Sequence, residues 1–463
     1  MGVLVYLAAS AAAIGGFLFG YDVGVISGVL IMDPFEDRFG YAHNSLLKGF
    51  IVSSLVLGCF FGSLAASYLA DRFGRKVSII IGGIMFTIGG ALQASSFEIG
   101  QLLVGRIVAG LAIGVLSMVV PLYQSEIAPK EIRGTLVSMQ QLAITIGIFV
   151  SFLINLGCAK IEGGASWRIP LGIQCVPAVT LALVMLILPK SPRWLTSKGR
   201  TDEAMEVLRK VATNPEEEME EMNDAIRMEQ EMEKPSWLEL LGPNLRRRVL
   251  IGIAIQVFQQ LTGINAVMYY APTIFKTAGF VGSTAQLTAT AINGAVNVCM
   301  TIPAVIYVDR LGRRPLLLAG AALMALAMIL VGALIAIFAP RNFDDKSAGY
   351  ATIALIYMFV AFFACTWGPI GWIYPSEIYS TRVRAKCMSI TTASNWAFNF
   401  IIALVVPPLI NSISWGLYII FGACGVLMFL FVYFFVPETK GKSLEQIDHM
   451  LGGRVNLEEK NKV

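Results

Sequence analysis

Long uncharged hydrophobic runs, separated by short charged segments, recur along the whole 463-residue chain. A helix needs about 20 largely apolar residues to cross the hydrocarbon core of a bilayer, so each run of that length is a candidate membrane-spanning helix. The pattern predicts twelve such helices, at 3–30, 47–70, 77–95, 100–122, 136–158 and 169–189, then at 248–277, 285–308, 315–338, 350–375, 386–411 and 414–436.

One highly charged segment, 190–247, interrupts this pattern between the sixth and seventh runs. Its acidic and basic residues mix with apolar ones at helical spacing around Met205 and Leu208, which favours short surface helices over disorder. The chain is therefore predicted to be an all-α membrane protein with four parts. They are an N-terminal six-helix bundle, 1–189, a cytoplasmic linker, 190–247, a C-terminal six-helix bundle, 248–436, and a cytoplasmic tail, 437–463.

Composition excludes several classes of protein. Hydrophobic residues make up 56% of the chain and charged residues 14%, which is outside the usual composition of a soluble domain. The sequence has no phosphate-binding glycine loop, metal-ligand cluster or nucleophile with a matching base, so neither an enzyme nor a cofactor nor a metal is expected. The net charge of +4 is not gathered on a soluble face, so no binding of nucleic acid is expected.

The distribution of basic residues predicts the orientation in the membrane. Most of the 35 Lys and Arg residues fall in loops on the side of the membrane that also holds both termini, and cytoplasmic loops carry such an excess. Both termini are therefore predicted to be cytoplasmic. The first run begins almost at Met1 without a basic segment before it and is longer than the apolar core of a signal sequence, so we expect it to be retained as a helix.

Short motifs recur in the same order in the two halves of the chain. An ordered set of this kind predicts two six-helix halves related as a parallel repeat, which is the plan of transporters whose halves rock around a site near the bilayer midplane. The three pairs are Asp71-Arg-Phe-Gly-Arg-Lys76 with Asp309-Arg-Leu-Gly-Arg-Arg314, Ser125-Glu-Ile127 with Ser376-Glu-Ile378, and Pro189-Lys-Ser-Pro192 with Pro437-Glu-Thr-Lys440.

The charged residues of these motifs are expected to act as a gate. Ion pairs within each half would close the cytoplasmic end of the pathway, whereas the alternative is that the charges only fix the orientation of the helices. Their repetition at matched positions favours the gate. The expected partners are Glu126 with Arg75 and Arg133, and Glu377 with Arg313 and Arg384.

The motifs resemble those of the sugar porter family of the major facilitator superfamily. Beside the two Asp-Arg-x-Gly-Arg loops, the similar segments are SPRWL at 191–195, QQLTGINAVMYYAP at 259–272 and PETKG at 437–441. The resemblance extends from FGYDVGVISG at 19–28 to the tail, and CTWGP at 365–369 is similar to fungal members. It implies the major facilitator fold and uptake of a monosaccharide such as glucose. For uptake, a monomer in the plasma membrane is the default expectation. Lys190 departs from the glutamate usual in the family, which suggests a weaker inward gate or an altered cycling rate.

Amide side chains inside the apolar runs indicate where a sugar would bind. They are costly in lipid unless turned inward, and a neutral polyol needs fixed amides and an aromatic face. Gly263 separates Gln260 from Asn265, so a local helix break could present both amides to one cavity, although any single amide could be a packing bond between helices. The resemblance implies sugar contacts at Gln141, Gln259, Gln260, Asn265, Asn297, Trp372 and Asn395, walls at Phe19, Phe363 and Trp396, and outer occlusion by Tyr269 and Tyr270.

Asp22 is a carboxylate inside the first apolar run, where it needs a partner or a proton. Arg106 in the fourth run is its expected partner, and movement of Arg106 during the transport cycle could release or capture a proton. Proton-coupled sugar porters are similar in having both residues, whereas passive animal glucose carriers typically have asparagine in place of this aspartate. The sequence therefore favours sugar:proton symport.

Two other functions stay open. In a facilitative uniporter, Asp22 and Arg106 would form a permanent structural ion pair without proton coupling. In a sugar-sensing receptor, binding would be reported to the cytoplasm without useful transport. Receptors that resemble sugar porters usually have a long cytoplasmic tail, whereas the segment after Pro437 is short.

Overall fold

The computed structural model of the protein describes residues 3–41, 43–127, 133–212, 214–231, 238–280, 282–341, 343, 346–379 and 381–440. The side chains of some helical residues, including Arg133 and Arg384, lie outside the described part. Within the described ranges, twelve spans are long and apolar enough to cross a membrane, which confirms the predicted number. They are Leu4–Val29, Ser45–Phe73, Arg75–Ala94, Ile99–Ile127, Met139–Cys158, Ala165–Ile187, Leu245–Thr277, Ser283–Tyr307, Arg313–Arg341, Lys346–Pro375, Lys386–Ile413 and Gly416–Phe435.

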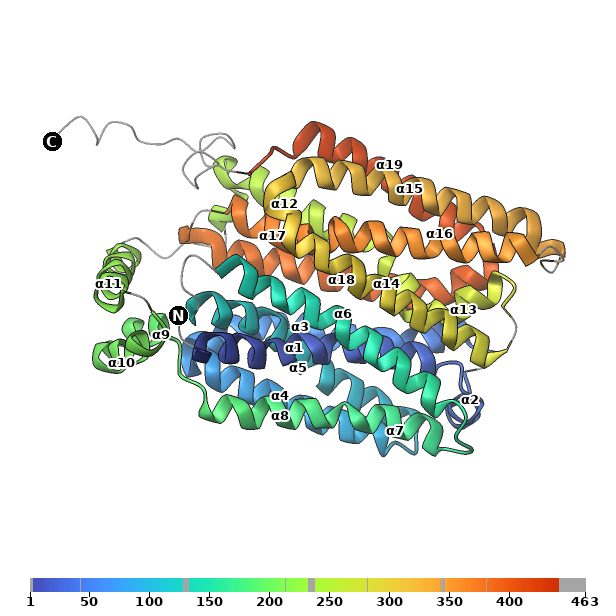
Figure 1. Ribbon diagram of the computed structural model, residues 1–463, viewed down its shortest axis with the longest axis horizontal. Coiled ribbons are helices and arrows are strands. Elements are labelled where there is room, and N and C mark those ends of the chain that lie inside the picture. Colours follow the sequence, from blue (N-terminus) through green and yellow to red (C-terminus); the bar gives the residue numbers. More distant parts are fainter. Residues whose placement is uncertain are drawn as a thin grey trace.

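The helices form two bundles that lie side by side, with the blue-to-green half below the yellow-to-red half in Figure 1. The N-terminal half contains α1 (Val3–Val29), α2 (Asp33–Phe39), α3 (Ser45–Phe73), α4 (Arg75–Ala94), α5 (Ile99–Ile127), α6 (Arg133–Cys158), α7 (Ala165–Ile173) and α8 (Cys175–Ile187). The C-terminal half contains α12 (Pro243–Leu261), α13 (Ile264–Thr277), α14 (Ser283–Leu311), α15 (Arg313–Phe338), α16 (Lys346–Cys365), α17 (Trp367–Ile378), α18 (Thr381–Ile413) and α19 (Gly416–Phe435).

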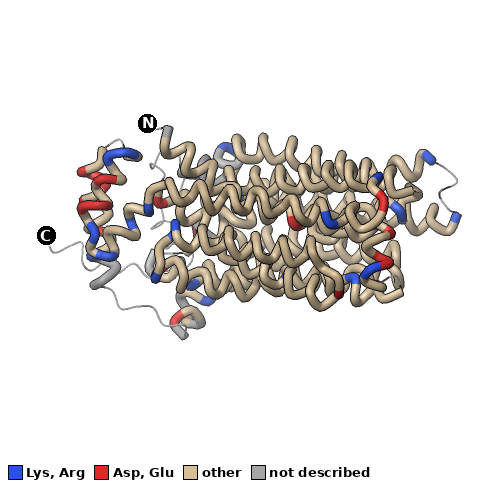
Figure 2. Tube along the Cα trace, turned by 90° about the horizontal axis from the view of Figure 1, so that it is seen from below, with Lys and Arg blue, Asp and Glu red and all other residues tan. Residues whose placement is uncertain are grey.

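The segment between the halves forms short helices, as the charge pattern predicted. They are α9 (Pro192–Ser197), α10 (Thr201–Val211) and α11 (Pro215–Glu231), and they lie beyond one end of the bundle, which we call the linker end (Figure 1). Leu195, Leu208 and Met219 join them through a small apolar cluster of their own. The charged residues gather at the two ends of the molecule, while the length between them is almost entirely uncharged (Figure 2).

Small residues bring the helices of the N-terminal half into close contact. A Cβ atom on Gly20 of α1 would lie 1.9 Å from the carbonyl oxygen of Ile144 on α6, and one on Gly110 of α5 would lie 2.0 Å from that of Leu55 on α3. Only glycine permits these approaches, which are typical of helix packing in membranes. They bring the backbone of α1 against that of α6, and the backbone of α5 against that of α3.

The main contacts between the two halves are those of α3 with α18, α6 with α14, and α1 with α13, and α6 also meets α17. At the first of these contacts, a Cβ atom on Gly49 would lie 2.3 Å from the carbonyl oxygen of Leu404. At the second, Gly294 of α14 lies against Phe149 and Phe152 of α6. The halves therefore meet along defined helix pairs.

Two of the predicted spans are broken inside the membrane-spanning region. The seventh separates into α12 and α13 at Gly263, which has the left-handed φ of 87° that glycine tolerates, so the expected break is present. The tenth separates into α16 and α17 at Thr366, where φ is −130° and ψ is −83°. At the second break, the backbone carbonyls of Trp367 and Gly368 accept hydrogen bonds from the side chain of Gln259.

The structure adds details that the hydrophobic pattern did not contain. The sixth span consists of α7 and α8, since Pro177 has no N–H to bond the carbonyl of Ile173. The loop after α1 contains α2, whose Phe35 and Phe39 rings pack 5.4 and 5.5 Å from the Trp167 ring, centroid to centroid. Aromatic packing, rather than helical periodicity, positions this short helix.

Candidate functional site

A chain of amide hydrogen bonds crosses the C-terminal half beside the break at Gly263. Asn265 Nδ2 donates to Gln260 Oε1 at 2.6 Å, and Gln260 Nε2 donates to Asn395 Oδ1 at 3.0 Å. Asn395 Nδ2 donates in turn to Gln259 Oε1 at 2.9 Å. Four of the predicted residues, from α12, α13 and α18, are therefore brought together.

Gln256 belongs to the same chain of bonds, and the sequence analysis missed it. It is fully buried, its Oε1 accepts from Asn395 Nδ2 at 2.5 Å, and its Nε2 donates to the carbonyl of Gly371 at 2.9 Å. Gln259 Nε2 similarly donates to the carbonyl of Trp367 at 2.9 Å. The spacing of three residues between Gln256 and Gln259 puts both on one helix face and could have revealed it. The amides thus connect α12 directly to α17, just after the second break.

Aromatic side chains border the amides at the boundary between the halves. The ring of Phe19 on α1 meets the ring of Trp396 on α18 edge to face, with centroids 5.2 Å apart. Trp396 is buried, and within the described residues its Nε1 has no hydrogen-bond acceptor. Trp396 directly follows Asn395 in the sequence, and an aromatic face and an unused donor are groups that a sugar site requires.

The other predicted contact residues are not hydrogen-bonded to this chain of amides within the described part of the structure. Asn297 on α14 and Phe363 on α16 are buried, whereas Gln141 on α6 and Trp372 on α17 are partly exposed. Tyr269 and Tyr270 are both buried on α13, where Tyr270 Oη donates to the carbonyl of Ala403 at 2.5 Å.

Asp22 and Arg106 form a buried ion pair within the N-terminal half. Both side chains are fully buried, and Arg106 Nη2 lies 3.5 Å from Asp22 Oδ2. This distance is too long for a good hydrogen bond, and neither oxygen of Asp22 has a hydrogen-bond donor within the described residues. The pair is therefore held by charge attraction rather than by the bidentate geometry of a strong pair.

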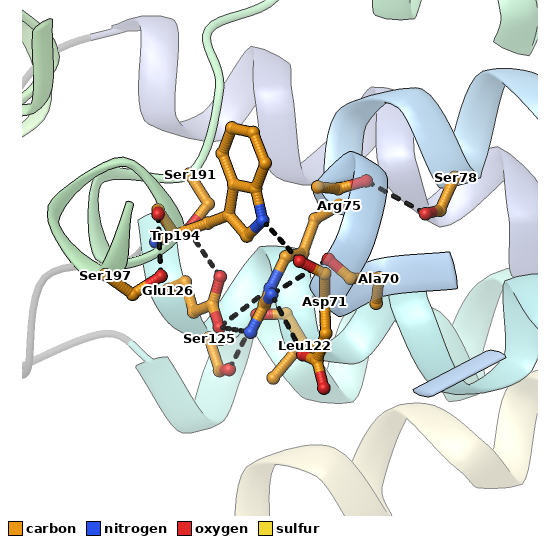
Figure 3. Close-up of polar contacts among 11 residues, drawn as sticks. Ala70, Asp71, Arg75, Ser78, Leu122, Ser125, Glu126, Ser191, Trp194 and Ser197 are labelled. Carbon is orange, nitrogen blue, oxygen red and sulfur yellow. Dashed lines mark hydrogen bonds and ion pairs between the residues drawn. The ribbon is translucent and has the colours of Figure 1, made fainter. Parts of the chain in front are cut away.

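Matched clusters of charged and hydroxyl groups lie at the linker end of each half. In the N-terminal half, Arg75 Nη2 lies 2.8 Å from Glu126 Oε1, and Ser191 Oγ bonds the other oxygen of Glu126 (Figure 3). In the C-terminal half, Arg313 Nη2 lies 2.7 Å from Glu377 Oε1, and Thr439 Oγ1 donates to Glu377 Oε2 at 2.6 Å. The side chains of the other two predicted partners, Arg133 and Arg384, lie outside the described residues.

The two clusters carry opposite charges at one matched position, which is Glu438 in the C-terminal half and Lys190 in the N-terminal half. Glu438 accepts from the backbone N–H groups of Arg313 and Arg314, both at 3.0 Å, and of Thr439 and Lys440, both at 2.9 Å. Burial alone would raise the pKa of the Glu438 carboxyl, but these four donors outweigh it and leave the pKa below its ordinary value. Lys190 Nζ instead lies 3.8 Å from Glu203 Oε2 on α10.

The fold and these sites define a multi-pass membrane transporter, because two six-helix halves enclose polar groups beside broken helices. The chain matches the family model described as "Sugar (and other) transporter" over residues 8–451, and it belongs to that family. It is a sugar transporter, which confirms the expectation from its motifs.

Relatives with known names and structures are similar along nearly the whole chain. The "MFS glucose transporter mfs1" of Aspergillus flavus is 40% identical, with 96% of this chain and 89% of that protein covered. The "Sugar transport protein MST7" of Oryza sativa subsp. japonica is 38% identical, with 98% and 92% covered. The solved structure of the proton:xylose symporter XylE bound to 6-bromo-6-deoxy-D-glucose has a TM-score of 0.81 at 32% identity, with 97% and 99% covered.

Proposed function

We propose that this protein carries a monosaccharide such as glucose into the cell together with a proton, by alternating access between its two halves. The observation that carries the proton coupling is the buried, weakly bonded Asp22–Arg106 pair. An ionised carboxylate inside a membrane protein is costly unless its partner stays close. A change of 1 or 2 Å between the two groups would therefore be enough to favour uptake or release of a proton.

The monosaccharide would bind at the amides beside the two helix breaks. Amide groups that now bond one another can exchange those bonds for sugar hydroxyl groups without leaving a buried polar atom unpaired. Because α12 is bonded to the backbone of α17, such an exchange would also loosen the contact between these helices. The proposed contacts are Gln141, Gln256, Gln259, Gln260, Asn265, Asn297, Trp372 and Asn395, with Phe19, Phe363 and Trp396 as apolar walls.

The remaining parts would gate the pathway. Tyr269 and Tyr270 would occlude the outer side, where α13 packs against α1. The clusters around Glu126 and Glu377, with Arg133 and Arg384 as further partners, would stabilise the closed linker end. We place the linker end and both termini in the cytoplasm. We divide the chain into the N-terminal bundle, the linker, the C-terminal bundle and the tail, with boundaries after residues 189, 247 and 436. We propose a monomer in the plasma membrane that binds no nucleic acid or cofactor and catalyses no reaction.

Uptake of radiolabelled glucose into proteoliposomes tests this function. With an inward proton gradient, the wild type should concentrate glucose above equilibrium, and the gain should vanish when an uncoupler is added. Asp22→Asn should still exchange glucose across the membrane without concentrating it. If the wild type only equilibrates glucose, with or without the gradient, the protein is a facilitator.

Facilitated diffusion is the second candidate, and one observation favours it. The Asp22–Arg106 pair is present and fully buried in the described conformation, as a permanent structural ion pair would be. In that case Asp22→Asn would lower the melting temperature, while the wild type would never accumulate sugar. Accumulation of glucose by the wild type under a proton gradient therefore distinguishes the two functions.

A further inference from the structure

Arg106 has neutral hydrogen-bond acceptors as well as its charged partner. Its Nη1 donates to Oε1 of Gln93 on α4 at 3.4 Å, and its Nη2 donates to the carbonyl of Val52 on α3 at 3.3 Å. Asp22 Oδ2 on α1 lies at nearly the same distance, 3.5 Å. The guanidinium is therefore shared between a carboxylate on one helix and neutral oxygens on two others.

The packing around Gln93 leaves its side chain little freedom to form other hydrogen bonds. The side chain is fully buried near the end of α4, and its Nε2 has no acceptor within the described residues. A Cβ atom on Gly105 of α5 would lie 3.0 Å from Gln93 Cγ, and one on Gly89 of α4 would lie 2.5 Å from the backbone nitrogen of Ala109. This tight packing of α4 on α5 keeps the amide oxygen of Gln93 directed at Arg106.

A buried guanidinium needs acceptors in every state of the transport cycle. When Asp22 takes up a proton it no longer attracts Arg106 as an anion, and Gln93 and Val52 remain as acceptors. When Asp22 is ionised, the same neutral oxygens compete with it for the guanidinium. The strength of the Arg106–Gln93 bond thus sets how strongly Arg106 favours the ionised form of Asp22.

We propose that Gln93 is a positioning residue for proton coupling, which holds Arg106 in place when Asp22 is protonated and so sets the pH range of coupled uptake. This inference rests on the proposed symport. Within the described residues, the titratable groups that interact electrostatically with Asp22 include Arg106 on α5, Cys59 on α3, Tyr269 on α13 and the adjacent Tyr21. Thiol and phenol groups are ordinarily neutral near pH 7, so Arg106 supplies the formal charge that faces Asp22.

Two substitutions of Gln93 test this role in opposite directions. Gln93→Met keeps the volume but removes the competing oxygen, so Arg106 favours ionised Asp22 more strongly. The pH of half-maximal gradient-driven uptake should then fall, by about one unit for a tenfold change in proton affinity. Gln93→Glu presents a second carboxylate to Arg106, so the half-maximal pH should rise by a similar amount or coupling should be lost.

The measurements are the pH dependence of glucose uptake and the accumulation ratio in proteoliposomes, with glucose counterflow as the test of folding and sugar binding. Counterflow should stay within about threefold of the wild type, the range expected when only the proton step changes. Gln101 on α5 provides the matched control, because its Nε2 bonds Ser95 Oγ and the carbonyl of Leu92 instead of Arg106. Gln101→Met and Gln101→Glu should leave the pH profile unchanged.

The outcomes separate this inference from the symport itself. A wild type that never concentrates glucose overturns both. A wild type that concentrates glucose, with Gln93 variants that retain its pH profile, overturns the role of Gln93 alone and leaves it as a packing amide between α4 and α5. If Gln93→Met does not fold, Gln93→Glu and the shorter Gln93→Asn provide the same test, since Gln93→Asn should also lower the half-maximal pH.

Discussion

Replacement of Glu438 by alanine should destabilise the C-terminal half. The change removes one carboxylate that accepts four backbone hydrogen bonds, two of them from the first turn of α15 at Arg313 and Arg314. Loss of an acceptor at a helix N-terminus costs about 0.5–2 kcal/mol, and loss of a negative charge there costs about 0.3–1 kcal/mol more. Since Glu438 is partly exposed and water can replace some of these bonds, we expect a loss of about 2 kcal/mol.

The assay is thermal unfolding of the purified protein in detergent, followed by intrinsic fluorescence. For a unit of about 190 residues, 1 kcal/mol corresponds to about 2–4 °C, so Glu438→Ala should lower the melting temperature by about 4–8 °C. Lys190→Ala is the matched control, because the described structure shows no backbone N–H bonded to this side chain, and it should change the melting temperature by under about 2 °C. Lys190→Glu should raise it, since a carboxylate there can accept from the first turn of α4.

Two results would refute this reasoning. One is a Glu438→Ala variant whose melting temperature equals that of the wild type. The other is a Lys190→Ala variant that loses as much stability as Glu438→Ala, since the effect would then come from the loop and not from the acceptor.

Three further predictions concern the bonds of Glu438, the break at Gly263 and the chain of amides. The pKa of Glu438 is lowered in the folded protein, so ionised Glu438 stabilises the fold at pH values above the ordinary glutamate pKa. This stabilisation is lost as the pH falls through the pKa of the folded protein. The melting temperatures of the wild type and Glu438→Ala should therefore converge in acid. Gly263→Ala should lower the melting temperature and glucose uptake far more than Gly157→Ala. Gly263 has a φ of 87°, and a Cβ atom added there would lie 2.6 Å from the Phe421 ring, whereas one added at Gly157 would have no neighbour within 4 Å. Asn395→Leu removes the centre of the amide chain and should weaken glucose binding in equilibrium assays by about tenfold or more, whereas Ser394→Ala, whose hydroxyl bonds its own helix, should change it little.

Most of the polar groups that the structure brings together can be identified from the sequence, since a polar residue inside an apolar run is conspicuous. Asp22, Arg106, Gln260 and Asn395 were found in this way, and the break at Gly263 followed from the glycine between two amides. Gln256 and Gln93 were missed. Gln93 is a single amide in an otherwise apolar span, and only its bond to Arg106 distinguishes it. Gln256 lies one helical turn before Gln259, and its bonds to Asn395 and Gly371 show that it belongs to the same site.

The sequence by itself determined the twelve spans, the repeat of two halves and the family. A span is recognised from a contiguous apolar run long enough to cross the bilayer, and each motif is likewise a contiguous segment. Only the tertiary structure decided that Asn395 joins Gln256, Gln259 and Gln260, and that Arg106 is shared between Asp22 and Gln93. Helical periodicity shows which residues occupy one face of a helix, but not which faces of distant helices meet. Which helix faces meet depends on close backbone contacts such as the one at Gly20. Shifts of tenths of an ångström in such packing decide which side chains can form hydrogen bonds.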